Sequence, residues 1–154
     1  MKYFVHESLG CAIVDSGVTA TVAGRVWMEC YLDRLSEKEK CKIISLKSND
    51  TFKFGSDCVV TPMYKLKVPF GIKGVTIDVD VVHNDIPLLL SYESMRKAGT
   101  SINFKDGTVK MFEKKLNSFV TRSGHIAVLL SHNLTVLRNV VNGTGRVNLN
   151  FEVE

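Results

Sequence analysis

The residues best placed to do chemistry are Asp15, Ser16 and Gly17, which directly follow the apolar residues Ile13 and Val14. An apolar strand that ends in a carboxylate holds the acid in a constrained turn, partly shielded from water, where it can take part in acid–base catalysis. The Ser16 hydroxyl can hydrogen-bond across a symmetric interface, and glycine allows a close backbone approach. Asp-Ser-Gly is also common in ordinary turns, so the tripeptide alone does not predict a function.

A second apolar segment, further along the chain, supports a functional interpretation of Asp15-Ser16-Gly17. Ile86 to Ser91 is an apolar run of strand length that ends in a small residue. A helix is expected directly after it, over 92–98, with Met95 facing inward and Gly99 ending the helix. An apolar strand that leads through a small residue into a helix can pack against the loop that carries the acid.

A hairpin is expected between these two segments, with strands over 51–54 and 58–60 and a turn at Gly55-Ser56-Asp57. The order of apolar strand, Asp-Ser-Gly, flap hairpin, apolar strand and helix resembles the retropepsin-like aspartic proteases of retroviruses and long-terminal-repeat retrotransposons. The resemblance covers roughly residues 9–130. It departs from the family's pattern at Ser91, where glycine is usual, and after Gly17, where an acidic residue often follows.

The resemblance implies that Asp15 is the catalytic residue and that no metal or organic cofactor is needed. The loop that carries the acid would be supported by Ser16, Gly17, Val18 and Thr19. The flap over the substrate would comprise Phe52, Phe54, Gly55, Ser56 and Asp57. The residues that pack beneath the loop and line the pocket would be Leu88, Leu89, Leu90 and Ser91.

One catalytic aspartate implies two chains, because aspartic proteolysis needs two carboxylates that share a proton. The sequence contains no second Asp-Ser-Gly or Asp-Thr-Gly, and Asp106-Gly107-Thr108 has the wrong order. A chain of 154 residues is also too short for the two-lobed, pepsin-like arrangement. We therefore expect Asp15 to meet the Asp15 of a second copy in a homodimer, with an extended peptide or polyprotein substrate between them.

The spacing of apolar runs and turn residues predicts a single all-β domain with short helices. The resemblance narrows this to a closed, retropepsin-like β-barrel with one active-site half in each chain. The protease domain is expected over 1–131, and 132–154 is expected to be an extension that adds a strand or a dimer-interface segment. The predicted strands are 9–14, 19–22, 51–54, 58–60, 64–68, 75–82, 86–90, 101–104, 108–112, 118–122 and 126–130. The predicted helices are 24–35, in which Val26 and Trp27 are among the apolar residues at helical spacing, 37–44, which begins with a capping box of Ser36 and Glu39, and 92–98. A hairpin turn is expected at Glu113-Lys114-Lys115.

The composition disfavours several other classes. The net charge is +4, but the basic residues are scattered along the sequence, so no nucleic-acid partner is expected. No apolar run reaches the roughly 20 residues of a membrane-spanning helix, and charge comes too early in the first residues for a signal peptide. The four cysteines lack metal-ligand spacing. A cytoplasmic location, in a retroelement particle or outside one, is the expectation.

Two alternatives to a homodimeric aspartic endopeptidase stay open at this point. A catalytically inactive domain of the same fold could serve dimerisation or peptide binding, as Ser91 and the residues after Gly17 suggest. A nucleic-acid-binding β-barrel is a third interpretation, based on the net charge alone.

Overall fold

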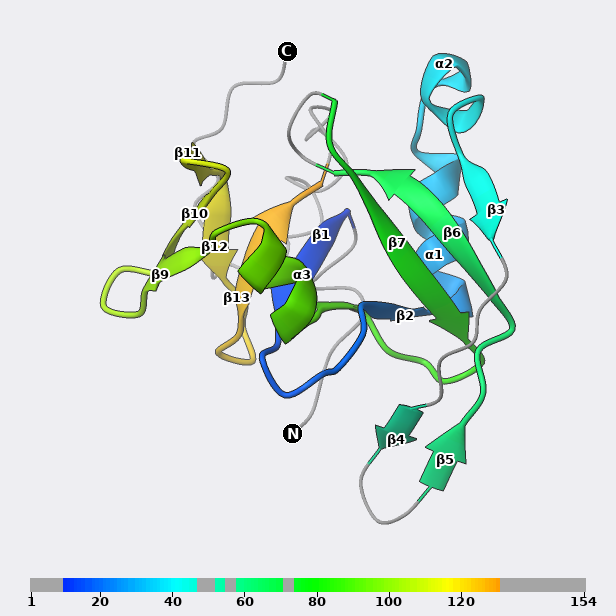
Figure 1. Ribbon diagram of the computed structural model, residues 1–154, viewed down its shortest axis with the longest axis horizontal. Coiled ribbons are helices and arrows are strands. Elements are labelled where there is room, and N and C mark those ends of the chain that lie inside the picture. The colour runs from blue at the N-terminus through cyan, green and yellow to red at the C-terminus, as the bar shows by residue number, and fades with distance from the viewer. Residues whose placement is uncertain (1–9, 47–51, 55–57, 71–73, 131–154) are drawn as a thin grey trace.

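The computed structural model describes residues 10–46, 52–54, 58–70 and 74–130. These ranges consist mainly of strands, so the all-β class predicted from the sequence is confirmed (Figure 1). The three helices are α1 (Arg25–Asp33), α2 (Glu37–Lys40) and α3 (Tyr92–Lys97). The strands are β1 (Cys11–Val14), β2 (Val22–Gly24), β3 (Ile44–Leu46), β4 (Phe52–Phe54), β5 (Cys58–Val60), β6 (Tyr64–Pro69), β7 (Thr76–Val82), β8 (Leu88–Leu90), β9 (Ser101–Asn103), β10 (Thr108–Met111), β11 (Lys114–Leu116), β12 (Ser118–Val120) and β13 (Ile126–Leu129). The expected extension, 132–154, lies outside the described residues.

Eight of these strands form one sheet in the order β12-β13-β1-β8-β2-β7-β6-β3. Its strand β1 runs antiparallel to β13 and parallel to β8, and residues 12–14 lie opposite residues 88–90. The closed barrel that we expected is not found in the described part of the chain. A sheet closes only when its outer strands pair with each other, and here β12 pairs with β13 while β3 pairs with β6.

Strand β1 is buried on both of its faces, which explains why its sequence is continuously apolar rather than alternating. Cys11 and Ile13 pack in one apolar cluster, together with Leu89 of β8. Ala12 and Val14 belong to the cluster on the opposite face, which also takes in the side chains of α1. The strand that leads to Asp15 is therefore held from both sides.

Helix α1 packs its aromatic side chains against the sheet. Trp27 and Tyr31, one turn apart, are buried and stacked with ring centroids 5.1 Å apart, and the Tyr31 hydroxyl donates to the Pro69 carbonyl at 3.0 Å. Burial raises the pKa of the Tyr31 phenol. The helix was predicted, but Val26, which we expected to face inward, is 47% exposed, and Met28 is buried instead.

The second predicted helix is much shorter than 37–44. The capping box is present: the Ser36 hydroxyl accepts from the Glu39 N–H, and the Glu39 carboxylate accepts from the Ser36 N–H. None of the residues of α2 is buried, however, so no packing against the core stabilises a longer helix. Ile44 instead begins β3, which pairs with β6.

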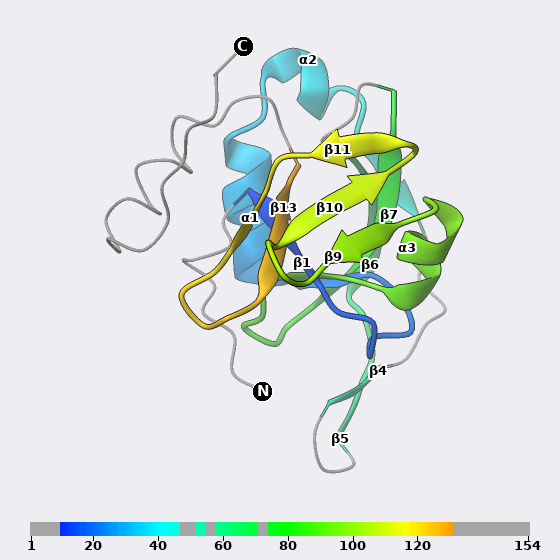
Figure 2. The same ribbon diagram turned by 90° about the vertical axis from the view of Figure 1, so that its left-hand side faces the viewer.

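A smaller sheet, β11-β10-β9, stands beside α3 and faces the viewer in Figure 2. We predicted that Glu113, Lys114 and Lys115 form a turn, and this is wrong for the two lysines. The turn is made by Phe112 and Glu113, whose φ angles are 51° and 62°, so Lys114 and Lys115 already belong to β11.

Gly24 joins β2 to α1 where the backbone of another segment passes very close. Its N–H donates to the Ile86 carbonyl at 3.0 Å. A Cβ at this position would overlap the Asn84 carbonyl oxygen and would lie 2.6 Å and 2.8 Å from the backbone O and N of Ile86. These are backbone atoms, so no side-chain rotation can relieve the clash.

We expect Gly24→Ala to lower the free energy of unfolding by about 3 kcal/mol, measured by denaturant titration, because overpacking forces the backbone to shift. Gly17→Ala is the matched control. A Cβ there would touch only the Asp15 Oδ1 atom, at 3.3 Å, so the same substitution should leave stability nearly unchanged. Equal stability of the two variants would contradict the close packing at Gly24.

The cysteines differ strongly in access to solvent. Cys11 in β1 is fully buried, and burial raises the pKa of its thiol, whereas Cys41 is exposed. Because the thiolate is the reactive form, iodoacetamide should alkylate Cys41 in the native protein and Cys11 only after denaturation. Peptide mapping by mass spectrometry checks this, and rapid alkylation of native Cys11 would show that β1 is open to solvent.

Within the described ranges, no helix has the length and apolar character needed to cross a membrane.

Candidate active site

The loop that follows β1 holds the Asp15 carboxylate by local hydrogen bonds. The Gly17 N–H donates to the Asp15 Oδ1 atom at 3.0 Å, and the Val18 N–H donates to the Asp15 carbonyl at 3.2 Å, which closes a tight turn. Asp15 is half-buried, whereas Ser16 and Gly17 are exposed. The carboxylate is therefore held in a fixed turn at the surface of the molecule, where another molecule can approach it.

The loop rests on the second apolar segment, as the sequence predicted. The Asp15 N–H donates to the Leu90 carbonyl at 3.1 Å, which continues the parallel pairing of β1 and β8 by one residue. On the other side of the loop, the Tyr92 N–H donates to the Val18 carbonyl at 3.2 Å. Leu88, Leu89 and Leu90 are buried. The structure thus brings the loop 15–19 together with 88–92, and two backbone hydrogen bonds join them.

Three hydroxyl groups lie beneath this junction. The Thr21 hydroxyl lies 3.2 Å from the Ser91 hydroxyl and 2.8 Å from the Ser94 hydroxyl, and the Ser91 hydroxyl lies 3.0 Å from that of Ser94. The Ser91 N–H also donates to the Thr21 hydroxyl at 3.1 Å. Ser91 and Thr21 are 1% and 3% exposed, so these hydrogen bonds join the loop to α3 in a nearly dry environment.

Ser91, which departs from the glycine usual in the family that the sequence resembles, fits this place without strain. Its φ of −72° is ordinary for any residue, and its side chain accepts from the Ser94 N–H at 3.1 Å as the N-cap of α3. The departure therefore leaves the packing beneath the loop intact.

Thr21 and Ser94 were not predicted as site residues. Ser94 follows Ser91 by three positions, which is the spacing between an N-cap residue and the backbone N–H that it binds. This spacing could have identified Ser94. Thr21 carries no comparable local signal because its partners are far away in the sequence.

Thr21→Val should lower the free energy of unfolding by about 2 kcal/mol, because it leaves the buried Ser91 N–H without its acceptor and removes the hydrogen bonds between Thr21 and the Ser91 and Ser94 hydroxyls. Thr76→Val is the control, since Thr76 is exposed on β7. Chemical denaturation measures both variants. Equal losses would mean that the hydroxyl cluster does not tie the loop to α3.

The predicted hairpin is present between the two halves of the site. β4 pairs antiparallel with β5, with Phe52 opposite Val60 and Phe54 opposite Cys58. Both views show the hairpin projecting from the same end of the molecule as the loop between β1 and β2 (Figures 1 and 2). The expected tip residues, Gly55, Ser56 and Asp57, lie outside the described residues.

A shallow hollow of about 360 Å³ lies beside the Asp15 loop. Ser16 lines it from the loop, and Tyr92, Arg96 and Ile102 are among the residues that line it from α3 and β9. Tyr92 is 57% exposed. The hollow therefore continues the site along α3.

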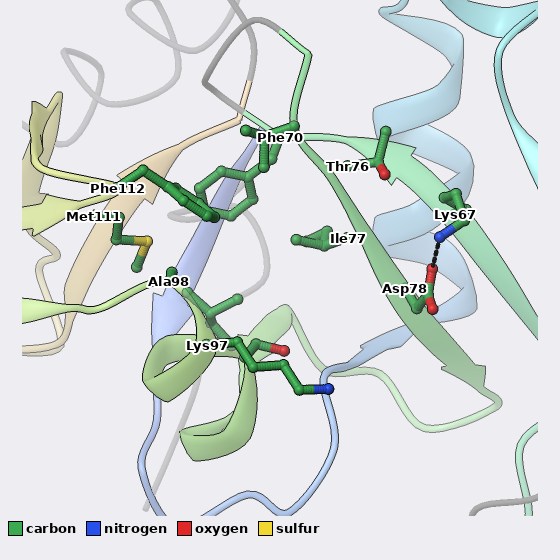
Figure 3. A pocket seen from close by; sticks show the side chains of 12 residues that line it. Lys67, Phe70, Thr76, Ile77, Asp78, Lys97, Ala98, Met111 and Phe112 are labelled. Atoms are coloured by element: carbon green, nitrogen blue, oxygen red, sulfur yellow. Dashed lines mark ion pairs between the residues drawn. The ribbon is translucent and has the colours of Figure 1, made fainter.

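A second cavity, of about 260 Å³, lies between β7, α3 and β10 (Figure 3). Phe70, Ile77 and Met111 line its interior, and the charged side chains of Lys67 and Asp78 pair with each other at 2.8 Å. Its lining includes one acid, Asp78, and no pair of acids. Across the described ranges, no group of three or more His, Cys, Asp or Glu side chains could hold a metal ion.

Comparison with known proteins gives little more. No protein-family model matches the sequence, and no curated protein matches it. Among solved structures, the chain is similar to the retroviral protease-like domain of Ddi1 from Leishmania major, at 15% sequence identity and a TM-score of 0.36. That match covers 68% of this chain and 83% of the other. A likeness at this level carries no argument about activity, so the case for a function rests on the site itself.

Proposed function

We propose that this chain is one half of a retropepsin-like aspartic endopeptidase that is active as a homodimer. The observation that carries the proposal is the seating of the Asp-Ser-Gly loop on the end of β8. The Asp15 N–H binds the Leu90 carbonyl, and the Gly17 N–H binds the Asp15 carboxylate. Asp15 is half-buried and the next two residues, Ser16 and Gly17, are exposed. A carboxylate held in this position can meet a second carboxylate from another chain.

The chemistry follows from two carboxyl groups that share one proton. The ionised carboxylate takes a proton from a water molecule, whose oxygen attacks the carbonyl carbon of the peptide bond. The protonated carboxyl group donates its proton to the carbonyl oxygen. The carboxyl group that took up the proton from water then donates a proton to the amine nitrogen as the carbon–nitrogen bond breaks. The other carboxylate accepts the proton of a hydroxyl group of the intermediate, so the two carboxyl groups share one proton again.

The second carboxyl group would be the Asp15 of another copy, because the sequence holds a single Asp-Ser-Gly. Such a dimer would be isologous, with the two loops facing each other across the two-fold axis. The hollow beside Ser16, with the exposed Tyr92 and Arg96 in its lining, is the surface that we assign to the partner subunit. An aromatic side chain and an arginine are typical anchors of such an interface.

An extended, largely apolar segment of a polyprotein would be the substrate. It would lie between the two loops, pair with backbone groups as an added strand, and be covered by the β4–β5 hairpin. The hairpin projects from the end of the molecule that carries the Asp15 loop, which supports this role.

Two measurements on the full chain test the proposal. Sedimentation equilibrium should show a dimer, and incubation with a library of apolar peptides at mildly acidic pH should give internal cleavage. A monomer at high concentration with no cleavage would overturn the proposal. A dimer that binds these peptides without cutting them would favour the inactive, peptide-binding alternative.

A further inference from the structure

The outer face of the small sheet β9–β11 carries only polar side chains at its central positions. Lys110 of β10 lies opposite Ser101 of β9 on one side and opposite Lys115 of β11 on the other. In the next row, Thr108 lies opposite Asn103. The buried Val109 and Met111 alternate with these residues and face inward. Two hydroxyls, an amide and two ammonium groups are therefore displayed together on one surface.

The Lys110–Lys115 pair is unfavourable in the isolated chain. Like charges directly opposite each other on neighbouring strands repel and destabilise a sheet. Neither lysine forms an ion pair within 4 Å in the described residues, although the charge of Lys115 contributes to lowering the pKa of the Asp106 carboxyl group. A bound anion between the two ammonium groups would remove the repulsion and would give both of them a partner.

The segment that forms this sheet is also unusually basic. Residues 101–122 hold five of the 20 basic side chains but only two of the 16 acidic ones, so most of the net charge of +4 lies here. Lys105, Lys110, Lys114 and Lys115 are all exposed. Of these, Lys110 and Lys115 lie opposite each other on the outer face.

The surface is hollowed rather than flat. A shallow depression of about 430 Å³ is lined by residues of all three strands, including Ser101, Asn103, Lys110 and Lys115. Asp106 also lines it, but its carboxylate accepts from the Thr108 N–H and hydroxyl at 3.0 Å and 2.7 Å. An open depression of this kind admits a chain that runs across it.

An exposed aromatic side chain lies in the turn that joins β9 to β10. Phe104, in the turn between β9 and β10, is 79% exposed, and Lys105 follows it. An aromatic ring beside basic side chains can stack on a nucleic-acid base while the ammonium groups contact phosphates. An acidic peptide would satisfy the lysines but would not use the ring.

We propose that the outer face of β9–β11 binds single-stranded RNA, with phosphates at Lys110 and Lys115 and a base stacked on Phe104. This goes beyond the proposed peptidase activity and departs from the expectation drawn from the sequence. No residue of the Asp15 loop lines the depression on this face, and Figure 2 shows the three-stranded sheet facing the viewer with the β4–β5 hairpin below it. RNA binding therefore does not require the catalytic residue.

Fluorescence anisotropy with a labelled single-stranded RNA of mixed sequence tests this on the full chain. The dissociation constant should rise steeply with salt. The Lys110→Gln/Lys115→Gln double variant should bind about ten-fold more weakly at low salt, and its salt dependence should be shallower by about 1.4 in the log–log slope, for two lost phosphate contacts. Phe104→Ala should weaken binding by about ten-fold and leave the slope unchanged.

Three controls keep the test decisive. Lys38→Gln/Lys42→Gln removes the same charge from exposed lysines elsewhere and should change the affinity less than about two-fold. Asp15→Asn should bind RNA as the parent does, which separates this test from that of the peptidase. Polyglutamate should not displace the RNA. Absence of salt-dependent binding, equal losses in both lysine pairs, an unchanged Phe104→Ala variant, or displacement by polyglutamate would each overturn the proposal.

Discussion

Asp15→Asn is expected to reduce peptide cleavage by at least about 1,000-fold, because it removes the group that accepts and returns a proton. The asparagine side chain has nearly the same shape, and its carbonyl oxygen can still accept the Gly17 N–H that now binds Oδ1 at 3.0 Å. The loop should therefore keep its geometry, and the unfolding midpoint should stay close to that of the parent. Turnover of an apolar peptide and thermal unfolding, measured on the same preparations, check both parts.

Asp85→Asn is the matched control for this variant. Asp85 is exposed in the segment between β7 and β8, so the same change of charge and shape there should leave cleavage intact. Normal cleavage by Asp15→Asn would remove Asp15 from the mechanism. If the parent, Asp15→Asn and Asp85→Asn were equally inactive while still binding peptide, the chain would be the inactive, peptide-binding domain.

The contact between the two halves of the site could be predicted from sequence because each half carries a strong local pattern. The apolar run before Asp15 and the apolar run before Ser91 have the length of buried strands, and both end in small or polar residues. Two such strands can lie side by side in one sheet, as β1 and β8 do, and the Asp15–Leu90 hydrogen bond continues their pairing. The hairpin of β4 and β5 could also be predicted from the sequence, because turn residues separate two short apolar runs.

What the sequence did not reveal depends on partners that are far apart along the chain. The end of α2 is set by β6, which recruits Ile44 to Leu46 into the sheet where a local capping pattern favoured more helix. The open edges of the large sheet depend on which strands pair, and no local pattern records this. Thr21 is an ordinary β-branched residue until the fold places it against Ser91 and Ser94.

The same reasoning applies to the lysines of the small sheet. Lys110 was predicted to lie in a strand and Lys115 in a turn, so the two lysines were not expected to lie opposite each other. Only the positive φ angles of Phe112 and Glu113 place the turn earlier and bring the two lysines opposite each other. Because the turn lies at 112–113 rather than at 113–115, Lys115 belongs to β11 and lies opposite Lys110.

Poisoning by the inactive variant is the second large effect that we expect. If each active site combines one Asp15 from each of two chains, a heterodimer of parent and Asp15→Asn holds only one carboxyl group and cannot share a proton. When the parent is co-refolded with about a nine-fold excess of the variant, only about one tenth of parent subunits find an intact partner. Cleavage per parent subunit should therefore fall about ten-fold.

The experiment separates a shared site from a self-contained one because the two alternatives predict different curves. For a site built from two chains, activity falls with the fraction of parent in the mixture even though the amount of parent is constant. For a site within one chain, added Asp15→Asn changes nothing. Co-refolding with Asp85→Asn instead should raise total cleavage in proportion to the protein added, since that variant keeps its own Asp15. If cleavage per parent subunit did not change with added Asp15→Asn, the second acid would not come from the Asp15 of another chain. The dimeric mechanism, in which two Asp15 loops face each other, would then be wrong.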